Sequence, residues 1–75
     1  MLHLRLSDLA HLDRVRNFLA AVHVQVHSVE GLELLVSVPG AASPLHEQRE
    51  IAAYVITYNA LNPGFGLELV EEPAL

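Results

Sequence analysis

The sequence predicts a single α+β domain over residues 1–75, built in the order strand, helix, strand, strand, helix, strand. Two observations predict this class. Runs with apolar residues two positions apart alternate with runs in which they are three or four apart, the periods of a strand and of a helix. Serine, proline and glycine stand at several of the places where one period gives way to the next.

The first strand is expected at residues 2–6, with a helix following to about residue 21. In the strand, apolar and polar side chains alternate in the order Leu2, His3, Leu4, Arg5 and Leu6. Ser7 is expected to cap the helix with its side-chain oxygen, and Asp8 adds negative charge at the positive end of the helix dipole. The helix carries one apolar stripe, made of Leu12, Val15, Leu19 and Val22.

Residues 22–38 are expected to form a β-hairpin. The period of two returns at Val22, Val24 and Val26, and again at Leu34, Val36 and Val38. Between these runs, residues 28–31 are predicted to form the turn, with Gly31 able to adopt positive φ. Pro39 and Gly40 are expected to end the second strand of the hairpin.

A second helix is expected over residues 44–61. Ser43 can cap it, and the proline at its first position loses no donor that the helix needs. Pro63 ends it, because proline removes a backbone donor and disfavours helical geometry in the residue before it. The last strand is expected over residues 65–71, where apolar and polar side chains alternate again.

The composition argues against several classes of partner and site. The net charge is −5 and all four basic residues are arginine, so we expect no nucleic-acid partner. No apolar run approaches the roughly 18 residues of a membrane span, and no signal peptide is evident, so a cytoplasmic location without membrane binding is expected. Without cysteine, disulfides and thiolate zinc sites are excluded, and we expect self-association to help stabilise so small and hydrophobic a chain.

Two strand-helix-strand units joined by a hairpin resemble the ferredoxin-like superfold. The resemblance implies a four-stranded antiparallel sheet in the order 4-1-3-2, with both helices on one face. This superfold includes metal chaperones, acyl-phosphate hydrolases, ribosomal proteins and ACT-type ligand-sensing modules, so it does not specify a function. ACT-type modules usually have a glycine-containing loop after the first strand, whereas here Leu6, Ser7 and Asp8 include no glycine.

On such a sheet, the side chains that alternate with the apolar ones form an outer face. We expect that face to carry His3, Arg5, His23, Gln25, His27, Glu33, Leu35, Ser37, Glu68 and Val70. Antiparallel sheets commonly expose one face to water, but this face could also pack on a second copy or on another protein. Its candidate interface residues are Leu35 and Val70 as apolar anchors and His3, Arg5, His23 and His27 as polar contacts.

A second candidate surface lies on the helix at residues 44–61. One orientation of this helix turns five residues toward the sheet: Leu45, Ala52, Val55, Ile56 and Asn59. Tyr54, Tyr58 and Leu61 then form a stripe near its outer side, and tyrosine is enriched at protein interfaces. In the alternative, Ile51 and the tyrosine rings pack against the first helix and leave only their hydroxyls in water.

No residue pattern predicts a catalytic residue, a metal ligand or a cofactor site. His23 and His27 would lie about 13 Å apart along one strand, at roughly 3.3 Å per residue, which is too far to share one ion. His46 and Glu50 are four residues apart on a helix, but the second histidine of the zinc-protease signature and a third ligand are missing.

The sequence therefore predicts a small non-catalytic binding module that acts as a homodimer or by recognising another protein. One alternative is an ACT-like domain that senses a small molecule between subunits, and a second is a small dimeric α+β-barrel enzyme using the sheet-face histidines. If the face is buried in an interface, acidification to about pH 5.5 should charge His3, His23 and His27 beside Arg5 and loosen the assembly.

Overall fold

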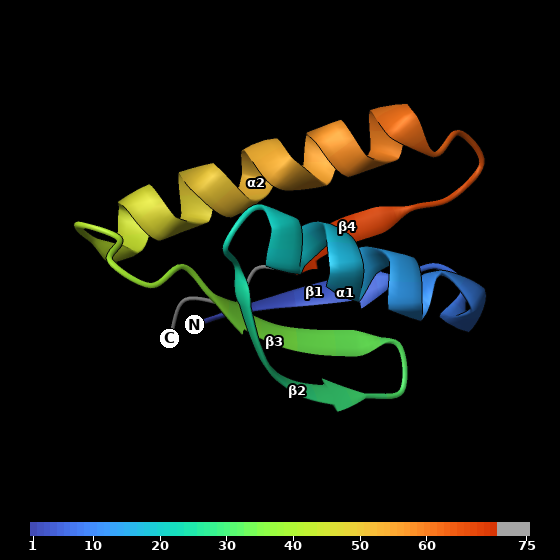
Figure 1. Cartoon of the computed structure of the whole chain (residues 1–75), viewed down its shortest axis with the longest axis horizontal. Coiled ribbons are helices and arrows are strands. Elements are labelled where there is room, and N and C mark those ends of the chain that lie inside the picture. Colours follow the sequence, from blue (N-terminus) through green and yellow to red (C-terminus); the bar gives the residue numbers. More distant parts are fainter. Residues whose placement is uncertain (71–75) are drawn as a thin grey trace.

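The computed structural model of the chain describes residues 1–70 (Figure 1). The strands are β1 (Leu2–Leu6), β2 (Gln25–Glu30), β3 (Glu33–Ser37) and β4 (Leu67–Val70). The helices are a short 3₁₀ helix, η1 (Leu9–His11), followed by α1 (Leu12–Ala21) and α2 (Pro44–Leu61). The α+β class is confirmed, and η1 is the one element that the sequence did not predict separately.

The four strands form one antiparallel sheet in the order β2-β3-β1-β4. This is the predicted order counted from the opposite edge. β1 lies in the interior of the sheet, where Leu4 stands opposite Leu34 on β3 and Leu69 on β4. The hairpin strand β2 and the last strand β4 are therefore the two edges of the sheet.

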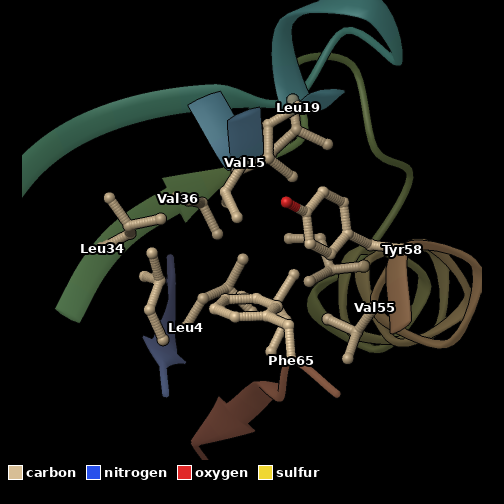
Figure 2. Close-up of a cluster of buried hydrophobic side chains, with 12 residues drawn as sticks. Leu4, Val15, Leu19, Leu34, Val36, Val55, Tyr58 and Phe65 are labelled. Carbon is tan, nitrogen blue, oxygen red and sulfur yellow. The ribbon is translucent and has the colours of Figure 1, made fainter. Parts of the chain in front are cut away.

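The hydrophobic core lies between one face of the sheet and the two helices (Figure 2). The strands contribute Leu4, Leu6, Leu34, Val36 and Leu67, which occupy alternate positions on the inner face. The helices contribute Val15 and Leu19 from α1, and Ile51, Val55 and Tyr58 from α2. Because both helices pack into this single core, the outer face of the sheet is left uncovered by any element in residues 1–70.

A β-bulge in β2 shifts the alternation of its side chains. Val26 lies opposite Val36, but Ser28 lies opposite Leu35, so His27 enters as one extra residue on the β2 side. Every residue of β2 after the bulge therefore occupies the face opposite to the one that strict alternation predicts. The sequence contains no proline or glycine at this point that would predict the bulge.

The hairpin turn is shorter than predicted, because the bulge lets β2 continue through residues 28–30. Val29 lies opposite Leu34, and Glu30 lies opposite Glu33 as the last pair of the ladder. The turn consists of Gly31 and Leu32, and not of residues 28–31. Gly31 has φ of +58°, as predicted, a conformation that glycine adopts without steric penalty.

The cap of the first helical segment also differs from the prediction. The Asp8 carboxylate, and not the Ser7 hydroxyl, caps η1 by accepting from the Ala10 N–H at 2.9 Å. The Ser7 hydroxyl instead accepts from the Gly66 N–H at 2.9 Å and ties the end of β1 to the loop before β4. Serine and aspartate can both cap a helix. The hydrogen bond of Ser7 with Gly66, 59 positions away, engages the serine hydroxyl and leaves Asp8 as the cap.

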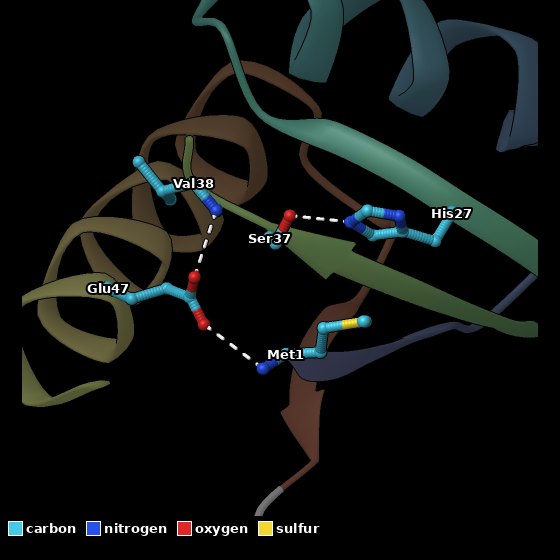
Figure 3. Close-up of polar contacts among 5 residues, drawn as sticks. All are labelled: Met1, His27, Ser37, Val38 and Glu47. Carbon is cyan, nitrogen blue, oxygen red and sulfur yellow. Dashed lines mark hydrogen bonds and ion pairs between the residues drawn. The ribbon is translucent and has the colours of Figure 1, made fainter. Parts of the chain in front are cut away.

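The start of α2 is as predicted, with Ser43 as the cap and Pro44 as the first residue. Glu47 in its first turn makes two contacts that the sequence does not indicate (Figure 3). Its carboxylate accepts from the Val38 N–H at 3.1 Å and lies 3.4 Å from the amino group of Met1. Glu47 thus connects the end of β3 and the start of β1 to the helix.

The last strand begins at Leu67 and not at residue 65, and its predicted end at Glu71 lies outside the described residues. The side-chain amide of Asn59 on α2 forms two hydrogen bonds with the Leu67 backbone, each 2.8 Å long. It accepts from the N–H and donates to the carbonyl oxygen, as a neighbouring strand would. This Asn59 clamp therefore occupies the open edge of β4 at Leu67.

Candidate functional site

Three rows of side chains run across the strands on the outer face of the sheet. The middle one, the apolar row, has Leu35, His3 and Val70 on adjacent strands, with His3 directly between the other two, and ends on β2 at Ser28, opposite Leu35. The side chains of Leu35, His3 and Val70 are partly buried. A shallow depression of about 200 Å³ adjoins His3 and Leu35. The centre of the outer face is thus formed by two aliphatic side chains and an imidazole.

The charged row lies beside the apolar row, toward the hairpin turn, and consists of Glu30, Glu33, Arg5 and Glu68. Arg5 stands between Glu33 and Glu68, and its Nη2 is 3.4 Å from the Glu33 Oε1. Both side chains of this ion pair are about half exposed, so water screens it and its contribution to stability is small. Three carboxylates surround one guanidinium, which gives this end of the outer face a net negative charge.

The polar row lies on the other side of the apolar row and consists of Gln25, His27 and Ser37. Gln25 is opposite Ser37, and His27, two residues farther along β2, lies on the same face. The His27 Nε2 is 2.6 Å from the Ser37 Oγ (Figure 3). Within the part of the chain that the structure describes, this row contains no carboxylate, so the two ends of the outer face differ in charge and in hydrogen-bonding groups.

The structure places all the predicted outer-face residues on this face except His23. The role of the face in an interface stays a prediction. His23 is not part of β2, because the residues before Gln25 are used to end α1. Our expectation that His23 adds to the pH sensitivity of the face is therefore wrong.

His23 lies in the turn that ends α1, with a backbone φ of +61°. Its N–H donates to the Ala20 carbonyl at 3.1 Å, and the Val24 N–H donates to the Leu19 carbonyl at 2.8 Å. This pair of bonds is a Schellman motif, in which glycine usually occupies the left-handed position. A residue with a Cβ costs about 1–2 kcal/mol in that conformation. His23 therefore lowers the stability of the turn that it forms.

Replacing His23 with glycine is expected to raise the free energy of unfolding by about 0.5–1 kcal/mol, because glycine removes the left-handed penalty and adds some unfolded-state entropy. His23→Ala is the control: it keeps a Cβ and should change stability little. Urea unfolding at neutral pH measures both. A loss of stability with glycine would contradict the prediction and show that the imidazole itself stabilises the fold.

The His23 side chain lines a cleft of about 380 Å³ between the α1–β2 turn, the β3–α2 loop and α2. His46, Glu50 and Tyr54 line it from the helix. Burial, followed by the nearby charge of Glu50 and a hydrogen bond with it, raises the pKa of Tyr54. Because the lining comes from three separate segments, no local sequence pattern predicts this cleft. Within residues 1–70, no three metal-ligating side chains lie close enough together to hold an ion.

Tyr58 lies in the core with only 3% of its surface exposed, so the prediction that it faces outward is wrong. Its ring contacts Phe65 edge to face at a centroid distance of 5.6 Å (Figure 2). It contacts Phe18 in the same manner, at 5.2 Å. Its hydroxyl is 3.2 Å from the Nδ1 of His11, which stacks on Phe65. Burial raises the pKa of Tyr58, and the charge of Arg14 acts in the opposite direction.

The predicted stripe on α2 does not form one surface. The helix turns Ile51, Val55 and Tyr58 to the core. Ile56 and Leu61 are 70% and 69% exposed, and Leu45 is exposed as well, so placing Leu45 and Ile56 against the sheet was wrong. Tyr54 is partly buried in the cleft, apart from Leu61 at the end of the helix.

Among the described residues 1–70, no helix combines the length and apolar character needed to cross a membrane. Comparison of the chain with protein-family models, with curated proteins and with solved structures found no match. Any function proposed for the chain therefore rests on the geometry of the outer face and of the cleft.

Proposed function

We propose that the chain is a small binding module of ferredoxin-like topology that self-associates through the outer face of its sheet. The observation that carries this proposal is the apolar row of Leu35, His3 and Val70 at the centre of a face that no helix covers. Charged and polar rows flank it on both sides. An apolar centre within a polar rim is the arrangement found in protein interfaces.

The edges of the sheet are less suited to self-association than its outer face. At β4, the Asn59 clamp already occupies the N–H and carbonyl groups of Leu67 that another strand would need. At β2, the bulge at His27 interrupts the regular spacing of the edge. Native proteins use both devices to prevent edge-to-edge pairing, so face-to-face packing is the favoured mode.

The size of the outer face sets the expected affinity. Four strands of four to six residues, spaced about 4.8 Å apart and rising about 3.3 Å per residue, give a footprint of roughly 300 Å². A stable interface of standard size buries about 800 Å² of accessible surface on each partner. We therefore propose a weak dimer that forms at high protein concentration or local enrichment.

Leu35→Glu is expected to abolish self-association, because it places a charge in the apolar row, next to His3. Light scattering or sedimentation from about 10 µM to about 1 mM should show the wild-type mass rising toward that of a dimer, and the variant remaining a monomer. Ile56→Glu and Leu61→Glu on α2 are matched controls and should behave as the wild type. Circular dichroism verifies that each variant is folded.

Two results would contradict self-association through the outer face. A wild-type chain that stays monomeric at every concentration would remove the dimer. Dissociation by Ile56→Glu or Leu61→Glu, with Leu35→Glu still dimeric, would move the interface to α2.

The ligand-sensing and enzymatic alternatives, and a cytoplasmic location, stay predictions. The enzymatic alternative is weakened, because it requires three histidines on the outer face and His23 does not lie there.

A further inference from the structure

We infer that the cleft between the α1–β2 turn, the β3–α2 loop and α2 binds a small primary amine in its protonated, ammonium form. In this site the Glu50 carboxylate pairs with the ammonium group, and the rings of His23 and His46 accept hydrogen bonds from it. The inference is independent of the proposed self-association, because the cleft lies on the helix side of the sheet and not on its outer face.

The size and the apolar wall of the cleft suit a small molecule. Its volume of about 380 Å³ lies toward the lower end of the range for small-molecule sites, about 300–1,000 Å³. Val22, Val38 and Tyr54 line the cleft and also pack against the core, so their positions are fixed by the fold. The cleft therefore offers a preformed apolar wall to the carbon skeleton of a ligand.

The charge of the cleft favours a cation. Among the described residues that line it, Glu50 supplies a carboxylate, and none is a lysine or an arginine. Glu50 is partly buried and takes part in neither of the ion pairs found within residues 1–70. A carboxylate that is partly removed from water and has no counter-ion favours a cationic ligand and repels an anionic one.

Two imidazole rings supply the remaining acceptors. Within residues 1–70, the rings of His11 and His27 form hydrogen bonds with other side chains, whereas those of His23 and His46 form none. His46 lies one turn before Glu50 on the same face of α2, and His23 lines the cleft from the α1–β2 turn. A neutral imidazole has one nitrogen that accepts, and a primary ammonium group has three donors.

The spacing of these side chains suits an ammonium group better than a metal ion. Within residues 1–70, no three metal-ligating side chains lie close enough together to bind one ion. Hydrogen bonds from an ammonium nitrogen are about 2.8 Å long, whereas zinc binds its nitrogen ligands at about 2.1 Å. A set of side chains too widely spaced for a metal can therefore still surround an ammonium group.

The backbone of His23 is a second, independent observation that points to this cleft. Its left-handed conformation, with φ of +61°, lowers the stability of the turn, and glycine usually occupies such a position. Strained residues are concentrated at functional sites, including sites that bind ligands. Because the His23 ring lines the cleft, ligand binding accounts for a side chain at a position where the fold favours glycine.

An anionic ligand is disfavoured, although the positive end of the α2 dipole borders the cleft. The His46 N–H in the first turn donates to the Ser43 hydroxyl at 3.1 Å, and the Glu47 N–H donates to the Ser43 carbonyl at 3.0 Å. Two of the backbone donors that an anion would use are therefore occupied. The charge of Glu50 opposes an anion as well.

An NMR titration with 2-phenylethylamine tests the inference, with 2-phenylethanol and 3-phenylpropionate as neutral and anionic probes of similar size. At about pH 8, where an imidazole is ordinarily neutral, the amine is expected to shift the amide signals of Gly40, Ala41 and Ala42 in the β3–α2 loop. The shifts should saturate with a dissociation constant of about 1 mM, as expected for so small a ligand. The alcohol should bind about tenfold more weakly, and the carboxylate more weakly still.

Two variants connect the binding with the named side chains. Glu50→Gln removes the charge with little change of shape and is expected to weaken amine binding about tenfold. Its matched control, Glu68→Gln on the outer face, makes the same change in net charge and should leave the affinity unchanged. His23→Gly should weaken binding several-fold although it is expected to stabilise the fold, so unfolding cannot account for its loss of affinity.

The inference is overturned if the alcohol or the carboxylate binds as tightly as the amine, or if the shifted signals lie away from the cleft. It is also overturned if the amine gives no saturable shift up to about 20 mM. Wild-type affinity in Glu50→Gln or in His23→Gly would contradict it too. An equal loss in Glu50→Gln and Glu68→Gln would show a response to net charge alone and no site. The proposed self-association is measured by mass and stands or falls separately.

Discussion

Replacing Tyr58 with alanine is expected to lower the free energy of unfolding by about 3–5 kcal/mol, the range seen when a buried aromatic side chain is truncated. Domains of this size have a total stability of roughly 4–11 kcal/mol. The substitution therefore removes a large part of what holds the fold together. The ring fills the space between α1, α2 and the loop before β4, where it contacts Phe18 and Phe65.

Tyr58→Phe is the matched control for this substitution. It keeps the ring and its edge-to-face contacts and removes only the hydroxyl near His11, so it should cost about 1 kcal/mol. Urea unfolding followed by circular dichroism measures both variants. If Tyr58→Ala kept wild-type stability but failed to self-associate, the ring would belong to a surface, as the sequence pattern first suggested.

The orientation of α2 illustrates what the sequence can and cannot predict about this helix. Its ends were predicted correctly, because Ser43, Pro44 and Pro63 act on the backbone next to them. The rotation of α2 about its own axis was not predicted correctly. Apolar residues occur on most sides of the helix, so several orientations bury a similar amount of surface. Packing against the sheet and α1 selects the orientation with Tyr58 inside and Ile56 outside.

The outer face of the sheet was more predictable than the helix, because alternation assigns each residue of a regular strand to one face. It was predicted correctly for β1, β3 and β4. It failed before Gln25, where the Schellman turn places His23 off the sheet, and after the bulge at His27. The bulge arises in the pairing with β3, for which the local pattern contains no signal. The turn at His23 is local, but it lacks the glycine that usually marks the end of a helix.

The largest effect expected from loss of polar contacts is at Asn59. Asn59→Ala is expected to lower the free energy of unfolding by about 2–4 kcal/mol, because two hydrogen bonds are lost and a partly buried N–H and carbonyl of Leu67 remain without their partner. The same change opens the edge of β4. We therefore also expect the Leu67 amide proton to exchange with solvent faster than in the wild type.

Asn59→Asp and Asn62→Ala are the controls that separate the clamp from a general weakening of α2. The aspartate carboxylate can accept from the Leu67 N–H but cannot donate to the Leu67 carbonyl, so at neutral pH Asn59→Asp should cost at least as much as Asn59→Ala. Asn62 donates one hydrogen bond to the Tyr58 carbonyl at the end of the same helix, and its removal should cost about 1 kcal/mol.

Urea unfolding and hydrogen exchange of the Leu67 amide together test the clamp. Faster exchange at Leu67 in Asn59→Ala than in Asn59→Asp, which keeps the acceptor for the Leu67 N–H, with exchange in Asn62→Ala as slow as in the wild type, would show that the side chain of Asn59 takes the place of a fifth strand at this edge. Equal exchange in all three variants would mean that another group protects the edge of β4. Of the two edges, β2 alone would then disfavour edge-to-edge pairing and direct self-association to the outer face.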